Sequence, residues 1–167
     1  MFDERLSTVA EEVASRLVER GETIAVAEGS CGGLVSASLL GVAGASRFYL
    51  GGAVVYTPAA ARGFVRGEIP APAGMRGATE TFAAYLATSV RLRLGATWGI
   101  GEGGATGPSP NPYGDPPGHA WLACDGPVTA TRHLLTGESD RRGNMVAFAT
   151  SALELLLECV ATPRSDL

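Results

Sequence analysis

Apolar side chains recur three and four residues apart near the start of the chain, at Leu6, Val9, Val13 and Leu17. This spacing is typical of an amphipathic helix with one face against a core. Asp3 is a suitable N-cap and Gly21 a suitable stop. The pattern therefore predicts an opening helix between these two residues.

The same reasoning predicts four further helices. One covers residues 32–40 and ends at Gly41, and a short one over 59–65 follows Thr57 as cap and Pro58 at the first helical position. A longer helix opens at Thr79 and ends at Gly95. The last helix is predicted to take Ser139 as its cap, because apolar residues line one side of the stretch that follows.

Short β-branched runs lie between these helices and predict strands over 23–27, 51–56 and 97–101. Two more runs flank Asp125-Gly126 and predict a late β-hairpin. Strands that alternate with helices favour a parallel sheet covered on both faces, to which the hairpin adds antiparallel pairing. The predicted fold class is α/β, a three-layer α/β/α sandwich with a mixed, mainly parallel sheet, in a single domain over residues 1–167.

Composition narrows the class of protein. The net charge of −4 carries no block of like charge, so we expect no nucleic-acid partner. The N-terminal stretch is charged where a secretory signal is apolar, and no run approaches ~20 uninterrupted apolar residues, so we expect a cytoplasmic protein with no membrane partner. Three cysteines at irregular spacing are expected to be reduced thiols.

All thirteen residues counted as lysine or arginine are arginine. A lysine base, a Schiff-base lysine and a Walker-type lysine are therefore excluded.

Ligands of open α/β sheets bind beyond the carboxyl ends of the strands. Three loops leave predicted strands there, over residues 28–33, 56–58 and 101–118. The first runs "EGSCGG" into a helix, and its glycines would let a phosphate or carboxylate approach unpaired amides, with Ser30 and Cys31 beside them. The alternative is a tight crossing in which Ser30 caps the helix and Cys31 packs inside.

The third loop holds five of the ten prolines, so we expect a rigid, substrate-facing segment. Its polar handles are Glu102, Thr106, Asn111, Tyr113, Asp115 and His119, although Asx and proline turns would use many of them internally. His119 and His133 fall on the hairpin and are expected to be structural. Two histidines without spaced carboxylates predict no metal site.

Five ordered segments resemble the CinA C-terminal domain, the nicotinamide mononucleotide amidohydrolase family. The stretch "AVAEGSCGGLVSASLLGVAGASRFYLGGAVVY" is similar to the family's A-E-S-C-T-G-G turn, its V-P-G-(A/S)-S segment and its G-G-V-V-x-Y strand. "RGATE", "GGATGP" and "SDRRGNM" are similar to the start of its next helix, its T-G-I-A-G-P loop and its G-D-R segment. The resemblance implies an α/β/α fold and hydrolysis of the carboxamide of a nicotinamide nucleotide to the acid and ammonia.

This chain departs from the family at the catalytic positions that the resemblance implies. The nucleophilic serine position is Gly29, with a hydroxyl one place later at Ser30. The general-base lysine position, five residues beyond Tyr56, is Ala61. The threonine of T-G-I-A-G-P is Gly103.

Two hypotheses follow. In the first the chain is an amidohydrolase of the family type, with Ser30 or Cys31 as substitute nucleophile and Tyr56 assisting; substrate-binding candidates are Glu28, Gly32, Gly33, Gly104, Thr106, Gly107 and Arg141. In the second the chain keeps the pocket without catalysis and binds a nucleotide or serves in assembly. We expect a small-molecule nucleotide as partner and no cofactor. Small-residue faces such as 37–40 could pack within the fold or across a homodimer, and of the two we favour the homodimer. A nucleophile elbow is excluded, because G-x-S-x-G around Ser30 needs glycine where Glu28 stands.

Overall fold

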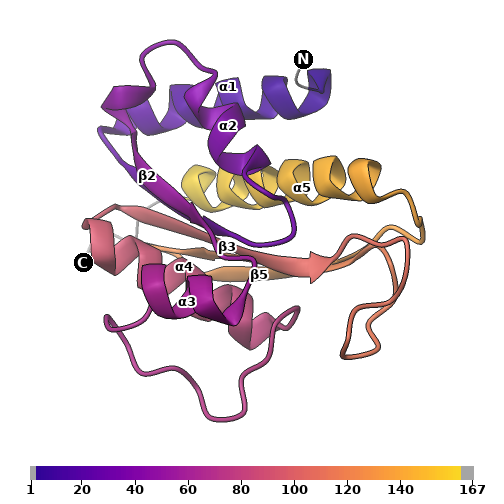
Figure 1. Ribbon diagram of the computed structural model, residues 1–167. Helices are drawn as coiled ribbons and strands as arrows, with labels where there is room; N and C mark the ends of the chain where they lie inside the picture. Colours follow the sequence, from indigo (N-terminus) through magenta and orange to yellow (C-terminus); the bar gives the residue numbers. More distant parts are fainter. Residues whose placement is uncertain (1–2, 163–167) are drawn as a thin grey trace.

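The computed structural model describes residues 3–162 and places one sheet between two layers of helices (Figure 1). Helices α1, α2 and α5 cover one face, and α3 and α4 cover the other. The elements in chain order are α1 (Glu4–Arg20), β1 (Ile24–Glu28), α2 (Leu34–Leu40), the 3-10 turn η1 (Ala45–Arg47), β2 (Tyr49–Val54), α3 (Pro58–Phe64), α4 (Glu80–Leu94), β3 (Trp98–Ala105), β4 (His119–Asp125), β5 (Ala130–Leu135) and α5 (Arg141–Ala161).

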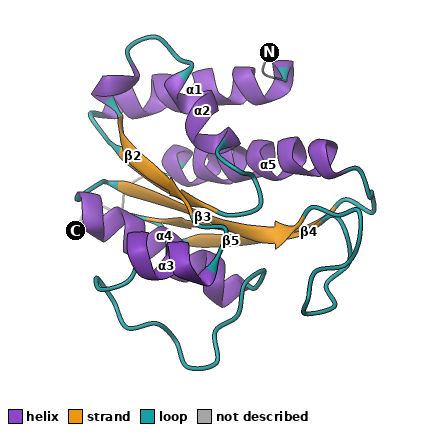
Figure 2. Cartoon of the chain, in the orientation of Figure 1, coloured by secondary structure: helices purple, strands orange, loops and turns teal. Residues whose placement is uncertain are grey.

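The five described strands are ordered β2-β1-β3-β4-β5 (Figure 2). β1 pairs in parallel with β2 and β3, whereas β3–β4 and β4–β5 are antiparallel. Of these five strands, four run in one direction and β4 runs against them. The predicted three-layer α/β/α sandwich with a mixed, mainly parallel sheet is confirmed.

Side-chain caps start α1, α3 and α4 where the sequence predicts them. Asp3 accepts a hydrogen bond from the amide of Leu6, and Thr57 and Thr79 cap α3 and α4 in the same way. The prediction that Ser139 caps the last helix is wrong. The cap is Asp140, whose carboxylate accepts from the amides of Arg142 and Gly143 and so satisfies two donors at once.

Strand β3 is longer than predicted, because Gly103 and Gly104, which were predicted in a loop, belong to the strand. A Cβ at Gly101 would lie 1.9 Å from the carbonyl oxygen of Ala83, and one at Gly99 would lie 2.1 Å from that of Ala87. Helix α4 therefore packs with its backbone directly on β3, which a side chain at either position would prevent. β2 also begins two residues earlier than predicted, at Tyr49.

The largest cluster of buried side chains lies between the sheet and the α1, α2 and α5 layer. Trp98, Phe48 and Phe148 are its largest fully buried members. Helix α5 is long and apolar enough to cross a membrane, with a mean hydropathy of 1.4, yet 61% of that window is buried inside the molecule. It packs on α1 and β4, as a core helix of this fold does.

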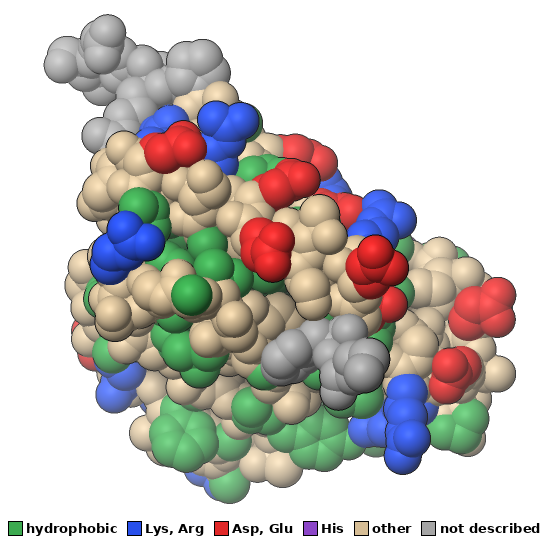
Figure 3. Space-filling model, turned by 90° about the horizontal axis from the view of Figure 1, so that it is seen from above, with side chains coloured by type: hydrophobic (Ala, Val, Ile, Leu, Met, Phe, Trp, Pro, Cys, Tyr) green, Lys and Arg blue, Asp and Glu red, His purple; other side chains and the backbone are tan. Residues whose placement is uncertain are grey.

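Acidic and basic side chains are interspersed over the face seen from above in Figure 3. No large field of one sign covers this face.

Candidate functional site

A cavity of about 410 Å³ lies where β1 and β3 end, and the three predicted loops meet around it. Gly29 and Ser30 come from the first loop, Tyr56 from the second and Asn111 from the third. The full lining is Gly29, Ser30, Val55, Tyr56, Thr57, Pro58, Ala61, Arg66, Met75, Arg76, Gly77, Ala78, Phe82, Tyr85, Gly103, Gly104, Asn111, Pro112 and Tyr113. The carboxyl-end rule thus located the cavity from the sequence.

The turn after β1 is folded around the buried carboxylate of Glu102. Oε2 of Glu102 accepts hydrogen bonds from the amides of Gly29 (3.0 Å) and Cys31 (2.9 Å). Oε1 accepts a short hydrogen bond from the hydroxyl of Ser30. Glu102 was predicted as a loop residue, but it lies within β3 and is fully buried.

Glu28 holds the other half of the turn. Its carboxylate accepts from the amides of Gly33 (3.1 Å), Val35 (3.0 Å) and Ser36 (2.9 Å), and from the Ser36 hydroxyl (2.6 Å). The start of α2 is thus capped by the protein's own carboxylate. The expectation of unpaired amides waiting for a ligand at Gly32 and Gly33 was wrong, because Gly32 N–H also has a partner, the carbonyl of Gly29.

Ser30 and Cys31 point to different environments. Ser30 lines the cavity with 7% of its surface exposed, whereas Cys31 is fully buried in the core cluster. Burial, reinforced by the charges of Glu102 and Glu28, raises the pKa of the Cys31 thiol well above its usual value. A Cys31 thiolate is therefore disfavoured, and of the two candidate nucleophiles Ser30 is the one that lines the cavity.

One amide of the turn stays open. Among the described residues, the N–H groups of Gly29, Cys31, Gly32 and Gly33 all have hydrogen-bond partners, and that of Ser30 has none. An unpaired amide on a nucleophilic residue can donate to an oxyanion.

Arg141, at the start of α5, ties the second loop to the third. Its guanidinium donates to the carbonyl of Gly107 (2.9 Å) and to the hydroxyl of Tyr56 (3.4 Å). The side-chain amide of Asn144 binds the carbonyl of Thr106 (2.9 Å). Thr106 and Gly107 are thus fixed against α5 outside the cavity lining, and Tyr56 lines the cavity while 66% exposed.

Gly103 and Gly104 form the part of the lining contributed by β3. A Cβ at Gly104 would lie 2.4 Å from the carbonyl oxygen of His119, so only glycine fits there. A Cβ at Gly103 would meet the ring of Phe82 at 2.9 Å. Phe82 occupies the space beside the position where the resemblance implies a threonine.

Polar side chains of the proline-rich segment bind one another, as the alternative of internal turn contacts predicts. The Asn111 side chain bonds the amides of Tyr113 and Asp115, and Asp115 receives a two-point contact from Arg76 at 2.6 and 3.2 Å. The Arg76 guanidinium also lies 4.9 Å from the centre of the Tyr113 ring. Contact with Arg76 holds the pKa of the Asp115 carboxyl below its ordinary value.

Arg66 and Arg76 line the cavity, and sequence reasoning missed both. They lie in the segment between α3 and α4, which carried no motif beyond its prolines and glycines. The sequence offered one signal: three arginines, at positions 62, 66 and 76, follow the predicted ligand loop at 56–58.

His119 and His133 are structural, as expected from their place on the hairpin. His119 Nε2 lies 2.8 Å from the carbonyl oxygen of Ala78, and His133 Nε2 lies 2.9 Å from His119 Nδ1. Within residues 3–162, no three histidine, cysteine or acidic side chains are grouped as a metal site would need.

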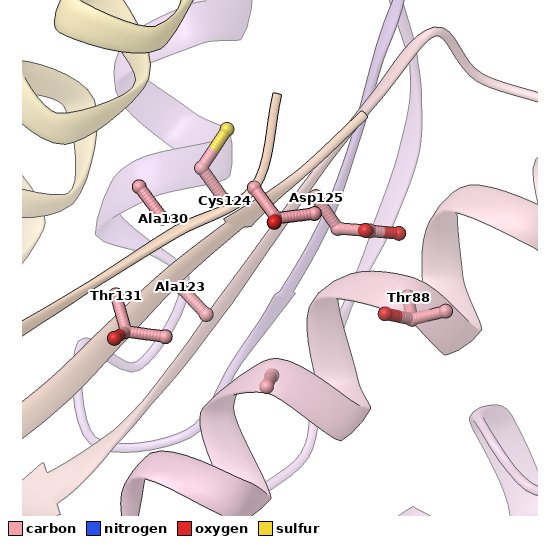
Figure 4. A pocket seen from close by; sticks show the side chains of 8 residues that line it. Thr88, Ala123, Cys124, Asp125, Ala130 and Thr131 are labelled. Carbon is pink, nitrogen blue, oxygen red and sulfur yellow. The ribbon is translucent and has the colours of Figure 1, made fainter. Parts of the chain in front are cut away.

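A second cavity, of about 350 Å³, lies at the opposite end of the strands, beside Asp125, which is opposite Gly99 in the β3–β4 pairing. Figure 4 shows the short side chains around it, including Thr88, Ala123 and Thr131. Asp125 is already bound by Arg91 at 2.7 Å. This cavity lacks the convergent polar groups of the first.

Known proteins resemble the chain over nearly its whole length. The family model described as CinA C-terminal domain matches residues 6–160. A CinA-like protein of Anaeromyxobacter sp. (strain Fw109-5) is 35% identical over 158 residues, covering 93% of this chain and 38% of the relative. The chain spans about a third of the length of the curated relatives that it matches.

Two solved structures share the fold. The competence/damage inducible protein CihA from Agrobacterium tumefaciens superposes with a TM-score of 0.86 at 24% identity, covering 97% of this chain and 99% of that one. The competence damage-inducible protein A (ComA) from Klebsiella pneumoniae gives 0.85 at 25% identity, covering 93% and 97%.

Proposed function

The chain belongs to the CinA C-terminal domain family, and from that membership we propose that it hydrolyses the carboxamide of nicotinamide mononucleotide to the acid and ammonia, with Ser30 as nucleophile. The observation that carries the proposal is the position of Ser30. Ser30 lines the cavity at the ends of β1 and β3, as do Tyr56 and Ala61. Ser30 directly follows Gly29, the position where the family resemblance implies the serine, and Ala61 is the position where it implies the lysine.

The lining suits a nucleotide that carries an aromatic base. Tyr56 and Phe82 offer aromatic rings for a pyridinium ring, which is a flat cation, whereas the Tyr113 ring already has the Arg76 guanidinium 4.9 Å from its centre. Arg66 offers a guanidinium group for a phosphate, whereas the guanidinium of Arg76 is already paired with Asp115. A volume of about 410 Å³ lies in the range of small-molecule sites.

The reaction is acyl transfer in two stages. The Ser30 oxygen attacks the carboxamide carbon, and the open amide of Ser30 itself donates to the oxygen that becomes negative. Ammonia leaves as the carbon–nitrogen bond breaks. Water then attacks the ester on Ser30, which releases the carboxylic acid and restores the hydroxyl.

A second candidate function is binding without turnover. It is favoured by Gly29 and Ala61, which leave no side-chain oxygen and no amine where the family resemblance implies its serine and lysine. In that case the cavity would bind the nucleotide and release it unchanged.

Ammonia release from nicotinamide mononucleotide, measured beside calorimetric binding, separates the two. The amidohydrolase predicts ammonia from the wild type and from Cys31→Ala, and a loss of at least about 100-fold in Ser30→Ala. Ser15→Ala, an exposed serine on α1, is the matched control. Binding without ammonia from the wild type would overturn hydrolysis in favour of the second candidate, and absence of both would overturn the nucleotide itself.

A further inference from the structure

We propose that Glu102 is the general base that activates Ser30, so that a serine–glutamate pair replaces the family's serine–lysine pair in this chain. The inference rests on the proposed function, because it names the partner of the same nucleophile. It starts from one contact: the Ser30 hydroxyl donates directly to Oε1 of Glu102.

The fold holds this carboxylate in one orientation. Two amides, of Gly29 and Cys31, bind Oε2 at 3.0 and 2.9 Å. That pairing leaves Oε1 to the Ser30 hydroxyl. A base that backbone donors already hold in place loses little entropy when it aligns with its nucleophile. In a catalytic triad the third residue orients the histidine in the same way.

Burial makes the carboxylate a stronger base than an exposed one. Glu102 is fully buried, and this desolvation raises its pKa above the ordinary value, with a smaller contribution from the charge of Glu28. The hydrogen bonds from Ser30 and Cys31 act in the opposite direction. In its ionised form, a carboxylate with a raised pKa is the stronger base and accepts a serine proton more readily.

No competing base reaches Ser30 among the described residues. Lysine is absent from the chain, and the Glu28 carboxylate is taken up by four donors around α2. His119 is held by Ala78 and His133. Glu102 is the titratable group in hydrogen-bond contact with the Ser30 hydroxyl.

Glu102 and Ser30 together can carry out every proton transfer that the reaction needs. When the Ser30 oxygen bonds to the carboxamide carbon, its proton passes to Glu102. Glu102 returns that proton to the departing nitrogen, so the carbon–nitrogen bond breaks and ammonia leaves. Water then attacks the Ser30 ester and gives a proton to Glu102, which passes it back to the Ser30 oxygen as the acid departs.

A sulfonyl fluoride tests the nucleophile without any nucleotide. Phenylmethylsulfonyl fluoride forms a sulfonate ester with an activated serine as fluoride leaves, and intact mass followed by peptide mapping locates it. We expect labelling at Ser30 in the wild type and in Glu138→Gln, an exposed matched control, and at least ~100-fold slower labelling in Glu102→Gln. Gln keeps an oxygen for the two amides, so circular dichroism and urea midpoints are expected to stay near those of the wild type.

The pH profile supplies the second readout. Labelling of the wild type is expected to fall as pH drops through the raised pKa of Glu102, and Glu102→Gln is expected to lose that limb. Labelling at Ser30 that is equally fast and has the same pH limb in Glu102→Gln would overturn Glu102 as base, as would a wild type that never labels at Ser30. Ammonia release is scored separately: labelling that depends on Glu102 without turnover of nicotinamide mononucleotide supports the pair and overturns the proposed substrate.

Discussion

Glu28 and Glu102 are opposite each other in the β1–β3 pairing, and both are fully buried. Each carboxylate binds a different half of the turn that joins β1 to α2. Glu102 holds the amides of residues 29 and 31, and Glu28 holds those of 33, 35 and 36. Two carboxylates that look like ligand groups in the sequence thus shape the turn that carries Ser30.

Glu28→Ala is expected to destabilise the protein by about 3 kcal/mol, because the buried amides that Glu28 satisfies would lose their partner. The free energy of unfolding from urea denaturation measures the loss. Glu11→Ala, on the exposed side of α1, is the control and is expected to change stability by less than ~0.5 kcal/mol. A Glu28→Ala protein as stable as the control would contradict the capping role.

Asp115→Asn is expected to cost about 1 kcal/mol, a modest figure because Arg76 is 39% exposed and its charge is screened by water. The folded-state pKa of Asp115 is lowered, so its contribution is present above the unfolded value near 3.9 and is lost as pH falls through the folded value. Wild type and variant should therefore converge in stability under acid conditions. Urea midpoints from about pH 2 to 7 measure this, and a constant gap across that range would refute the ion pair's role.

Gly104→Ala is expected to destabilise by about 3 kcal/mol or more, because the new methyl group would meet backbone of β4 at 2.4 Å. Gly63→Ala is the matched control. Position 63 lies in α3 with open space around it, so alanine there should stabilise by about 0.5–1 kcal/mol. Thermal unfolding of both variants gives the comparison, and a shift of the same sign in both would contradict it.

Gly29→Ser with Ala61→Lys places a serine and a lysine at the positions implied by the family resemblance. A Cβ at position 29 would lie 3.2 Å from the carbonyl oxygen of Val55 and 3.4 Å from that of Glu102, so the backbone there must move by a few tenths of an ångström. Since a positioned base contributes ~100-fold or more, ammonia release from nicotinamide mononucleotide should rise at least about 10-fold in the double variant. The two single substitutions are the controls, and equal gains from either one alone would exclude cooperation between the new groups.

Much of the framework follows from local chemistry. Thr57 and Thr79 predicted helix starts correctly, because a capping hydroxyl needs only its own next turn. The length of β3 was underestimated because Gly103 and Gly104 are typical of a loop, whereas in the fold they face Phe82 of α4 and the backbone of β4, long-range contacts that no local pattern reports. Ser139 was preferred over Asp140 as a cap because two adjacent capping residues cannot be ranked without the backbone.

The site was predictable in outline and not in detail. Three loops at strand ends indicated where a cavity would form, and the cavity is there. The sequence does not tell whether a carboxylate such as Glu102 faces a ligand or its own backbone, since both uses need the same residue. The directions of Ser30 and Cys31 are set by that same carboxylate, so they became visible only with the fold.

The ion pair of Arg76 with Asp115 bridges two connections that are 39 residues apart in the chain. A guanidinium and a carboxylate joined at two points favour one planar arrangement, so the separation of those connections is fixed by side chains independently of any ligand. Arg76 also lines the cavity, so under the proposed function a bound nucleotide would meet a wall whose position this ion pair already restrains, and less of its affinity would go into ordering that wall.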